Sequence, residues 1–313
     1  MGHCTYRVQI EGTVQGVGFR PFIYQLAHRY GLKGTVSNGT QGVEVHINAT
    51  PLELEELLSS IHAELPPLAS IDKLLTTQTD FTDFSDFTII TTKKEGKRTV
   101  RIPPDVSICK ACEAELFDPN NRRFGYPFIT CTHCGVRYSI IKQLPYDRVH
   151  TSMSDFKMCK ACEEEYTNPL DRRYHAQPIG CYDCGPTLNL HKGKEILDIS
   201  RDEIIDTCVR LLEGGKIFAV KGVGGYHLMC DATNDEAVQR LRDRKKRPSK
   251  PYAVMVPDIK SAGSFASIND KEKNLLTSKE RPIVLLHMKG RPEISKYVAP
   301  NLSRLGLFLP YTP

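Results

Sequence analysis

The cysteines are the residues of this chain whose types and spacing most clearly indicate chemistry. Of eleven cysteines, eight form four C-x-x-C pairs, and each half of the set reads C-x₂-C-x₁₈-C-x₂-C. The eight residues are Cys109, Cys112, Cys131, Cys134, Cys159, Cys162, Cys181 and Cys184. Four soft thiolates at this spacing are typical of a closed, tetrahedral, structural zinc site. We therefore expect two structural Zn²⁺ ions, with redox dithiols or iron as the alternatives.

The segment that carries these cysteines is an internal repeat with a period of 50 residues. The string CKACE at 109–113 returns at 159–163, and Arg122-Arg123 returns as Arg172-Arg173. A repeat this well aligned indicates a duplicated structural unit, here over residues 105–190. With so little apolar periodicity, we expect the unit to need metal to fold. The spacing leaves open whether the thiols pair within or across the repeats.

Three histidines lie near the cysteine pairs, at His133, His150 and His175. We do not expect them to be metal ligands, because four thiolates already fill each tetrahedral shell.

A second stretch whose residues could bind a ligand is GTVQGVGFR, residues 12–20. It lies between a short alternating run and a segment with helical features, so its backbone N–H groups and the helix N-terminus could bind an anion. Arg20 adds a planar fork of donors suited to phosphate. The alternative is a tight turn that needs glycine only for its backbone geometry.

A third stretch is the basic run RLRDRKKRPSK at residues 240–250. It is either an anion site or a solvated helix face. The formal charge of the chain, +5, does not decide between them. Eight thiolates on two Zn²⁺ ions would cancel most of that charge.

The elements around the glycine stretch predict a small α/β domain over residues 1–91. The expected strands are Tyr6–Glu11, Lys33–Ser37, Gly42–Asn48, Leu74–Gln78 and Phe87–Thr91, and the expected helices are Pro21–Tyr30 and Pro51–Glu64. Pro21 suits a first helical turn and Gly31 a helix end. The order β-α-β-β-α-β is the split βαβ arrangement.

The charged segment 92–104 is expected to be a linker, and from residue 200 helices and strands alternate as in an α/β domain. We expect helices at Arg201–Leu212, Asn234–Lys245 and Asp270–Lys279, with a buried strand at Lys216–Lys221 and further strands at Tyr252–Val256 and Ile283–Met288. The chain ends in an apolar stretch, LGLFLPYTP, without a polar tail. We therefore expect the domain over 200–313 to be incomplete.

The composition is that of an ordinary globular protein, with 40% hydrophobic and 25% charged residues. No apolar run approaches the ~18 residues of a membrane span, and the N-terminus lacks the features of a signal peptide. These features predict a cytoplasmic protein that does not associate with membranes.

The first domain resembles the acylphosphatase family, on the residues VQGVGFR followed by GLKGTVSNGTQGVEVHI (31–47). These ferredoxin-like enzymes hydrolyse acyl phosphates without a metal or cofactor. The resemblance implies that Arg20 binds the phosphate and that Asn38 orients the attacking water. It implies a phosphate cradle made of Gln15, Gly16, Val17, Gly18, Phe19 and Arg20.

The last region resembles the YrdC-like domain, which binds ATP and makes acyl adenylates. The matching strings are YHLMCD at 226–231 and KKRP at 245–248. By this resemblance Lys245 and Arg247 contact the triphosphate of ATP, which binds with Mg²⁺. Lys250 and Lys221 are further candidates for the nucleotide site.

The order of these three parts resembles the HypF family, the carbamoyltransferases of [NiFe]-hydrogenase maturation. That implies an α+β multidomain protein with a ferredoxin-like acylphosphatase domain, two small Cys₄ zinc modules and a partial α/β YrdC-like domain. It implies carbamoyl phosphate and ATP as substrates, HypE as the protein partner and cyanide on the hydrogenase iron as the end product. We expect the chain to be an N-terminal portion, either a fragment or one completed by a second polypeptide.

A different class of function is a zinc-containing, YrdC-like protein that binds or modifies tRNA. The zinc modules and the 240–250 run favour it. The chain, however, lacks a basic stripe interleaved with aromatic residues. Nucleic acid is therefore not the expected partner.

Overall fold

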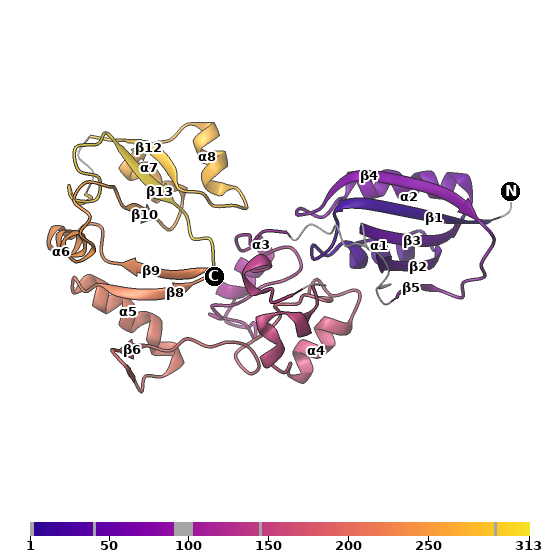
Figure 1. Ribbon diagram of the computed structural model, residues 1–313, viewed down its shortest axis with the longest axis horizontal. Helices are drawn as coiled ribbons and strands as arrows, with labels where there is room; N and C mark the ends of the chain where they lie inside the picture. The colour runs from indigo at the N-terminus through magenta and orange to yellow at the C-terminus, as the bar shows by residue number, and fades with distance from the viewer. Residues whose placement is uncertain (1–2, 40–41, 91–102, 144–145, 291–292) are drawn as a thin grey trace. The chain divides into compact units, whose positions relative to one another are not determined.

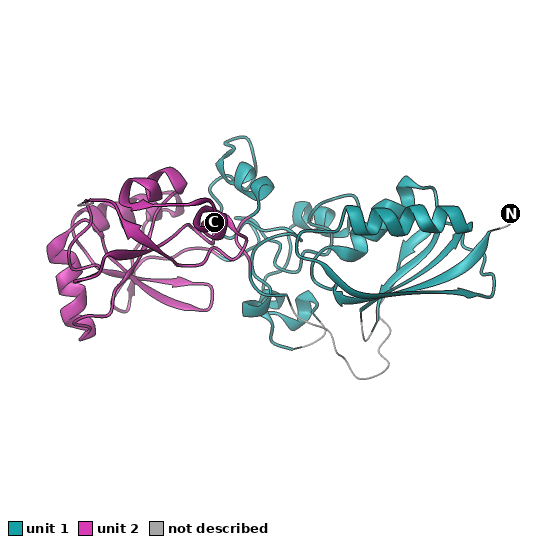
Figure 2. Cartoon of the chain, turned by 90° about the horizontal axis from the view of Figure 1, so that it is seen from above, with its two compact units in different colours: residues 1–105, 109–186 teal, residues 106–108, 187–313 magenta. Residues whose placement is uncertain are grey.

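The computed structural model describes residues 3–39, 42–90, 103–143, 146–290 and 293–313. The chain divides into two compact units (Figure 2). Unit 1 contains residues 1–105 and 109–186, and unit 2 contains residues 106–108 and 187–313. The linker expected at 92–104 lies almost entirely outside the described residues.

The first part of unit 1 is a five-stranded sheet with two helices, in the strand order β4-β1-β3-β2-β5 (Figure 1). Its elements are β1 (Cys4–Thr13), α1 (Phe19–Arg29), β2 (Lys33–Asn38), β3 (Gly42–Ala49), α2 (Pro51–Ala63), β4 (Ser70–Thr79) and β5 (Phe87–Ile89). Strand β3 pairs antiparallel with β1 and β2, and β1 also pairs antiparallel with β4. This is the predicted split βαβ arrangement, extended by β5, which runs parallel to β2.

The sequence explains both helices of this domain. Helix α2 starts with a capping box, in which Thr50 and Glu53 satisfy each other's backbone N–H groups. Helix α1 ends where Gly31 adopts a left-handed φ of 65°. Their apolar faces cover the sheet with fully buried side chains, among them Ile23 and Leu57.

The second part of unit 1 has little regular structure, as its weak periodicity predicts. It contains two short helices at equivalent points of the repeat, α3 (Lys110–Phe117) and α4 (Lys160–Thr167), and three 3₁₀ turns, η1 (Tyr138–Ile140), η2 (Arg148–His150) and η3 (Ser152–Asp155). Each short helix begins one residue after the first cysteine of its repeat.

Unit 2 contains a four-stranded sheet, in the order β10-β13-β12-β11, and two hairpins, β6-β7 and β8-β9. The strands are β6 (His191–Lys192), β7 (Glu195–Ile196), β8 (Phe218–Gly222), β9 (Gly225–Met229), β10 (Ala253–Met255), β11 (Ala266–Ser267), β12 (Val284–Met288) and β13 (Arg304–Phe308). The helices are η4 (Arg201–Glu203), α5 (Ile204–Glu213), α6 (Asp235–Lys245), α7 (Ile259–Phe265) and α8 (Asp270–Thr277).

The prediction of a buried strand at Lys216–Lys221 is wrong in its burial. Strand β8 forms there, but Ala219, Val220 and Lys221 are exposed. The reason is its pairing: β8 contacts only β9 in a two-stranded sheet and does not enter the larger sheet, where the buried core of unit 2 lies. Throughout the described ranges, no helix is long and apolar enough to cross a membrane.

Candidate functional site

The glycine stretch forms the connection from β1 to α1. Gly16 and Gly18 have φ values of 72° and 75°, in the left-handed region that glycine adopts most readily. Gly18 is also the N-cap of α1, and no side chain caps that end of the helix. The first amides of α1 therefore have no internal partner, which is the geometry that suits an anion.

The other side chains of the stretch shape the loop. Val17 and Phe19 are fully buried, so they anchor the loop in the core of the domain. The side-chain amide of Gln15 donates to the carbonyls of Gly39 (2.9 Å) and Gly42 (2.7 Å). Gln15 thus ties the loop to the connection between β2 and β3, directly after Asn38.

Arg20 lies in the first turn of α1 and has an unusual environment. Burial lowers the pKa of its guanidinium, and the nearby Asp147 carboxylate partly offsets this effect. Even so, no ion pair or hydrogen bond joins the guanidinium to a residue that the structure describes. Because arginine stays charged in proteins, Arg20 is a partly buried cation that an anion would complete.

Asn38, the last residue of β2, is buried, and its carbonyl oxygen Oδ1 has no hydrogen-bond partner among the described residues. A buried acceptor without a partner is costly and rare in native structures. Asn38 and Arg20 both line one cavity of about 40 Å³. The structure therefore brings together the two residues for which the sequence predicts catalytic roles.

The cysteine-rich part of unit 1 forms the opposite wall of this cavity. The lining there consists of Thr132, Arg137, Tyr146, Asp147, Tyr174, His175, Ala176, Gln177 and Pro178. Sequence reasoning missed this wall, because more than 100 residues separate it from the glycine stretch and no local pattern marks it. His175, predicted not to be a metal ligand, lies in the wall with a left-handed φ of 52°.

A buried arginine joins this wall to the glycine loop. Arg137 is 1% exposed and donates from Nε to the carbonyl of Gly16 (3.0 Å). Its other nitrogens donate to the carbonyls of Cys131 (2.8 Å) and Cys134 (2.5 Å). One side chain therefore ties the backbone of the glycine stretch to the backbone of two candidate metal ligands.

The eight paired cysteines form two clusters, each made within one repeat. The sulfur atoms of each cluster all lie within 4.8 Å of one another, which settles the pairing that the spacing left open. The sulfur–sulfur distances recorded for neighbouring thiols are 3.5–3.8 Å. Four thiolates around Zn²⁺ at ~2.3 Å would lie about 3.8 Å apart. Donor type and geometry therefore fit a tetrahedral metal site in both repeats.

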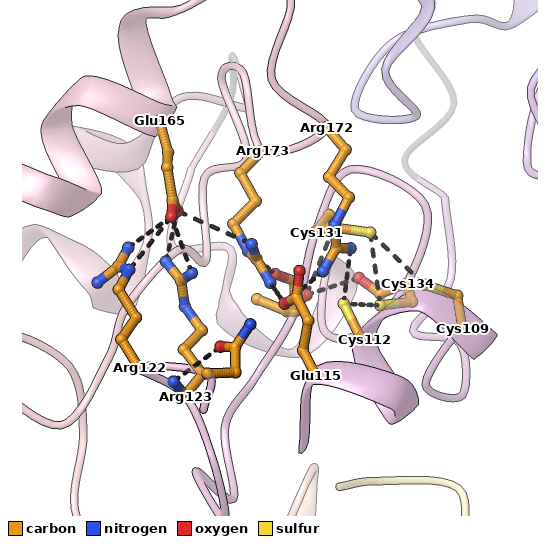
Figure 3. Close-up of polar contacts among 12 residues, drawn as sticks. Cys109, Cys112, Glu115, Arg122, Arg123, Cys131, Cys134, Glu165, Arg172 and Arg173 are labelled. Carbon is orange, nitrogen blue, oxygen red and sulfur yellow. Dashed lines mark hydrogen bonds and ion pairs between the residues drawn. The ribbon is translucent and has the colours of Figure 1, made fainter. Parts of the chain in front are cut away.

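The two repeats exchange arginines (Figure 3). From the first repeat, Arg122 donates to the sulfur of Cys162 (3.3 Å), while Arg123 forms an ion pair with Glu165 (2.6 Å). From the second repeat, Arg172 donates to the sulfur of Cys112 (3.0 Å), and Arg173 pairs with Glu115.

This exchange compensates charge. Each Cys₄ cluster around a divalent ion would carry a formal charge of about −2, and an arginine from the other repeat lies against it. Burial alone would raise the pKa of Glu165, but its hydrogen bonds from Arg123 and Arg122 outweigh burial and lower it. The arginine pairs, which the sequence shows only as part of the repeat, therefore join the two modules.

We expect Glu165→Gln to destabilise unit 1 by about 3–5 kcal/mol. The change leaves Arg123, whose side chain is 2% exposed, without its counter-charge. Urea unfolding at pH 7 measures the effect. Glu164→Gln, an exposed change on the same helix, is the matched control and should cost less than 0.5 kcal/mol. Equal stability of the two variants would contradict the assigned role of Glu165.

The four residues predicted to contact nucleotide lie in unit 2. Lys221 is on β8, Lys245 ends α6, and Lys250 follows in the loop, all three exposed. The side chain of Arg247 makes contacts within this loop: it donates to the carbonyl of Pro251 (2.7 Å) and lies over the ring of Tyr252. The loop also depends on Arg242, a buried residue that the sequence analysis did not select.

Arg242 donates to three carbonyls between residues 247 and 250 and to Val298 (3.1 Å). It holds the basic run against the core of unit 2. The structure thus divides the run into a buried, structural arginine and exposed lysines. No ion pair is recorded for the three lysines within the described ranges.

Three protein families match successive parts of the chain. Residues 6–89 match the acylphosphatase family, residues 108–141 and 158–191 match the HypF finger, and residues 210–313 match the telomere recombination family that includes Sua5, YciO and YrdC. Over 65 residues the chain is 42% identical to an acylphosphatase of Pseudothermotoga lettingae and covers 72% of it.

Longer relatives match the chain as a whole. The carbamoyltransferase HypF of Synechocystis is 48% identical over 309 residues, which are 99% of this chain and 40% of the relative. A probable carbamoyltransferase HypF of Methanocaldococcus jannaschii is 46% identical over 98% of this chain. A crystal structure of full-length HypF in the phosphate- and nucleotide-bound form superposes with a TM-score of 0.91 at 41% identity, covering 99% of this chain and 40% of that one. The chain spans about two fifths of the length of these relatives, and over that span nearly the whole of it is similar to proteins named carbamoyltransferase HypF.

Proposed function

We propose that this chain hydrolyses carbamoyl phosphate at the site formed by Arg20 and Asn38. The observation that carries the proposal is the cavity of about 40 Å³ that both residues line, which holds a partly buried guanidinium without an ion-pair partner among the described residues and a buried, unpaired amide oxygen. An acyl phosphate already has a good leaving group. Positioning and charge stabilisation are therefore enough for catalysis.

In the proposed mechanism, the amides of the glycine loop and the guanidinium of Arg20 hold the phosphoryl group. Asn38 accepts a hydrogen bond from water through Oδ1 and directs the water oxygen at phosphorus. The water oxygen bonds to phosphorus as the bond between phosphorus and the carbamoyl oxygen breaks; carbamate leaves with the bonding electrons, and a proton of the attacking water passes to solvent. Arg20 and the loop amides stabilise the charge on the phosphoryl oxygens as this bond breaks.

The wider proposal is that the chain contributes to ATP-dependent carbamoyl transfer in the cytoplasm. The carbamate would form carbamoyl adenylate with ATP and Mg²⁺ at Lys221, Lys245, Arg247 and Lys250, for transfer to a HypE-type partner and conversion to the cyanide ligands of hydrogenase iron. Relatives named carbamoyltransferase HypF, and a related structure with phosphate and nucleotide bound, support this proposal. The alternative of tRNA binding or modification is not favoured.

Each Cys₄ cluster is proposed to hold one structural Zn²⁺, bound by Cys109, Cys112, Cys131 and Cys134 in one module and by Cys159, Cys162, Cys181 and Cys184 in the other. Bound there, zinc would supply a fixed tetrahedral crosslink and no reactive position, because four thiolates close its shell.

The hydrolysis is tested by phosphate release from carbamoyl phosphate. We expect Asn38→Ala to lower kcat by about 10²-fold with little change in KM, because the variant keeps the phosphate cradle and loses only the group that directs water. Asn120→Ala, an exposed change in the zinc module, serves as the control. Absence of release by the parent chain would contradict the proposed hydrolysis, and a rise in KM alone would contradict the role given to Asn38.

A further inference from the structure

The zinc module places one tyrosine directly on the anion loop. The ring of Tyr146 packs over Gly16, where a Cβ atom would lie only 3.0 Å from Cδ1 and 3.2 Å from Cε1 of the ring. Gly16 therefore lacks a side chain for two reasons, its left-handed φ and the ring above it. Tyr146 also lines the cavity that contains Arg20 and Asn38.

The hydroxyl group of Tyr146 is buried and has no hydrogen-bond partner among the described residues. Burial raises the pKa of this hydroxyl to about 12, so it stays protonated at neutral pH and can both donate and accept. Two of the buried polar atoms without a partner thus belong to residues of one cavity, the hydroxyl of Tyr146 and Oδ1 of Asn38. Such atoms are expected where a ligand supplies the missing partner.

The wall around Tyr146 is built to hold its shape. The side chain of Gln177 is held at both its oxygen and its nitrogen: Oε1 accepts from the backbone N–H of Arg148 (2.7 Å) and the hydroxyl of Tyr166 (2.9 Å), and Nε2 donates to the carbonyl of His175 (2.9 Å). The imidazole of His175 stacks on Tyr166 at 5.0 Å. Tyr146 is the residue of this wall whose polar group is recorded as buried and unpaired.

The chemistry of the substrate decides what this hydroxyl would contact. A phosphoryl group offers only acceptors, and Arg20 with the loop amides already supplies donors to them. A carbamoyl group also offers N–H donors, and neither Arg20 nor a backbone N–H can accept a hydrogen bond. We propose that Tyr146 is a substrate-binding residue contributed by the zinc module, whose hydroxyl oxygen accepts a hydrogen bond from the carbamoyl NH₂ group and selects carbamoyl phosphate over acyl phosphates without that group.

This inference rests on the proposed hydrolysis and adds a specificity determinant to it. The two walls thus contact different parts of the substrate. The glycine loop binds the phosphoryl group, which all acyl phosphates share, and the zinc module contacts the carbamoyl group, in which the substrate differs from other acyl phosphates.

The test compares two substrates on the whole 313-residue chain. Phosphate release is measured from carbamoyl phosphate and from acetyl phosphate, which has a methyl group in place of NH₂. The ratio of interest is kcat/KM for carbamoyl phosphate divided by kcat/KM for acetyl phosphate. For Tyr146→Phe we expect this ratio to fall about tenfold, the scale of one lost hydrogen bond. The phenylalanine ring keeps the packing on Gly16, so the fold is retained.

The control is Tyr138→Phe, the same change at a residue of the same module that is 67% exposed; its ratio should equal that of the parent chain. An unchanged ratio in Tyr146→Phe, or an equal loss on both substrates, overturns the specificity role while the proposed hydrolysis stands. A parent chain that releases phosphate from neither substrate overturns the hydrolysis itself.

Discussion

Replacing Arg20 with alanine should lower kcat/KM for phosphate release from carbamoyl phosphate by at least about 10²-fold. The guanidinium is a partly buried charge in the cavity and has no counter-charge at ion-pair distance among the described residues. An anion that enters the cavity therefore meets a partly desolvated cation, and such a pair is stronger than one in water. The charge that spreads over the phosphoryl oxygens in the transition state strengthens the interaction further.

Arg20→Lys distinguishes the contribution of the positive charge from that of the planar donor geometry of the guanidinium. Lysine keeps the positive charge but cannot offer the planar pair of donors that matches a phosphate, so we expect its activity to fall between those of the parent and the alanine variant. Arg29→Ala is the matched control. It lies on the same helix, but its side chain is 53% exposed and its ion pair with Glu64 is a surface pair of little energetic consequence. Equal activity of Arg20→Ala and Arg29→Ala would refute the role of Arg20.

The second large effect should follow removal of metal. We expect chelation of the proposed zinc to unfold residues 109–184 and, with them, one wall of the cavity. The buried core of the second module consists of Cys162, Ala176, Ile179 and Cys181, so two of its four members are candidate ligands. Without metal little apolar surface remains to hold the module together. Structural zinc sites are stabilised by an apparent ~10–16 kcal/mol at pH 7.

Loss of metal should also disturb the glycine loop, because Arg137 joins that loop to the cysteine-rich part. This residue holds the Gly16 carbonyl only because the backbone at Cys131 and Cys134 is fixed. We therefore expect phosphate release to fall together with metal content, although no cysteine lines the cavity. Metal analysis, limited proteolysis and phosphate release, measured on the same samples, check this prediction.

Cys112→Ser is the single-site version of this experiment, and Cys208→Ser is its control. Cys208 is a partly buried cysteine of unit 2 outside both clusters. We expect the first variant to lose metal and phosphate release and the second to keep both. A parent chain with well below two zinc ions and an intact, protease-resistant module would contradict the structural role of zinc.

The sequence by itself determined the elements and the chemistry that depend on neighbours along the chain. The glycine stretch, Pro21 and Gly31 predict a strand, a loop and a helix around Arg20, because each residue acts through its own backbone conformation. The C-x₂-C spacing predicts Cys₄ sites for the same reason, since two ligands per pair lie within one turn of backbone. The 50-residue period predicts two equivalent modules.

Only the tertiary structure decided which distant segments meet. The pairing of thiols within each repeat depends on how the 18 intervening residues fold. The arginine exchange between repeats and the second wall of the cavity, with Arg137 and Tyr146, join residues 40 to 130 positions apart. Contacts of this kind leave no periodicity in the sequence, since they arise from packing of whole modules. The same holds for β8, whose apolar residues indicate burial while its pairing with β9 alone leaves it exposed.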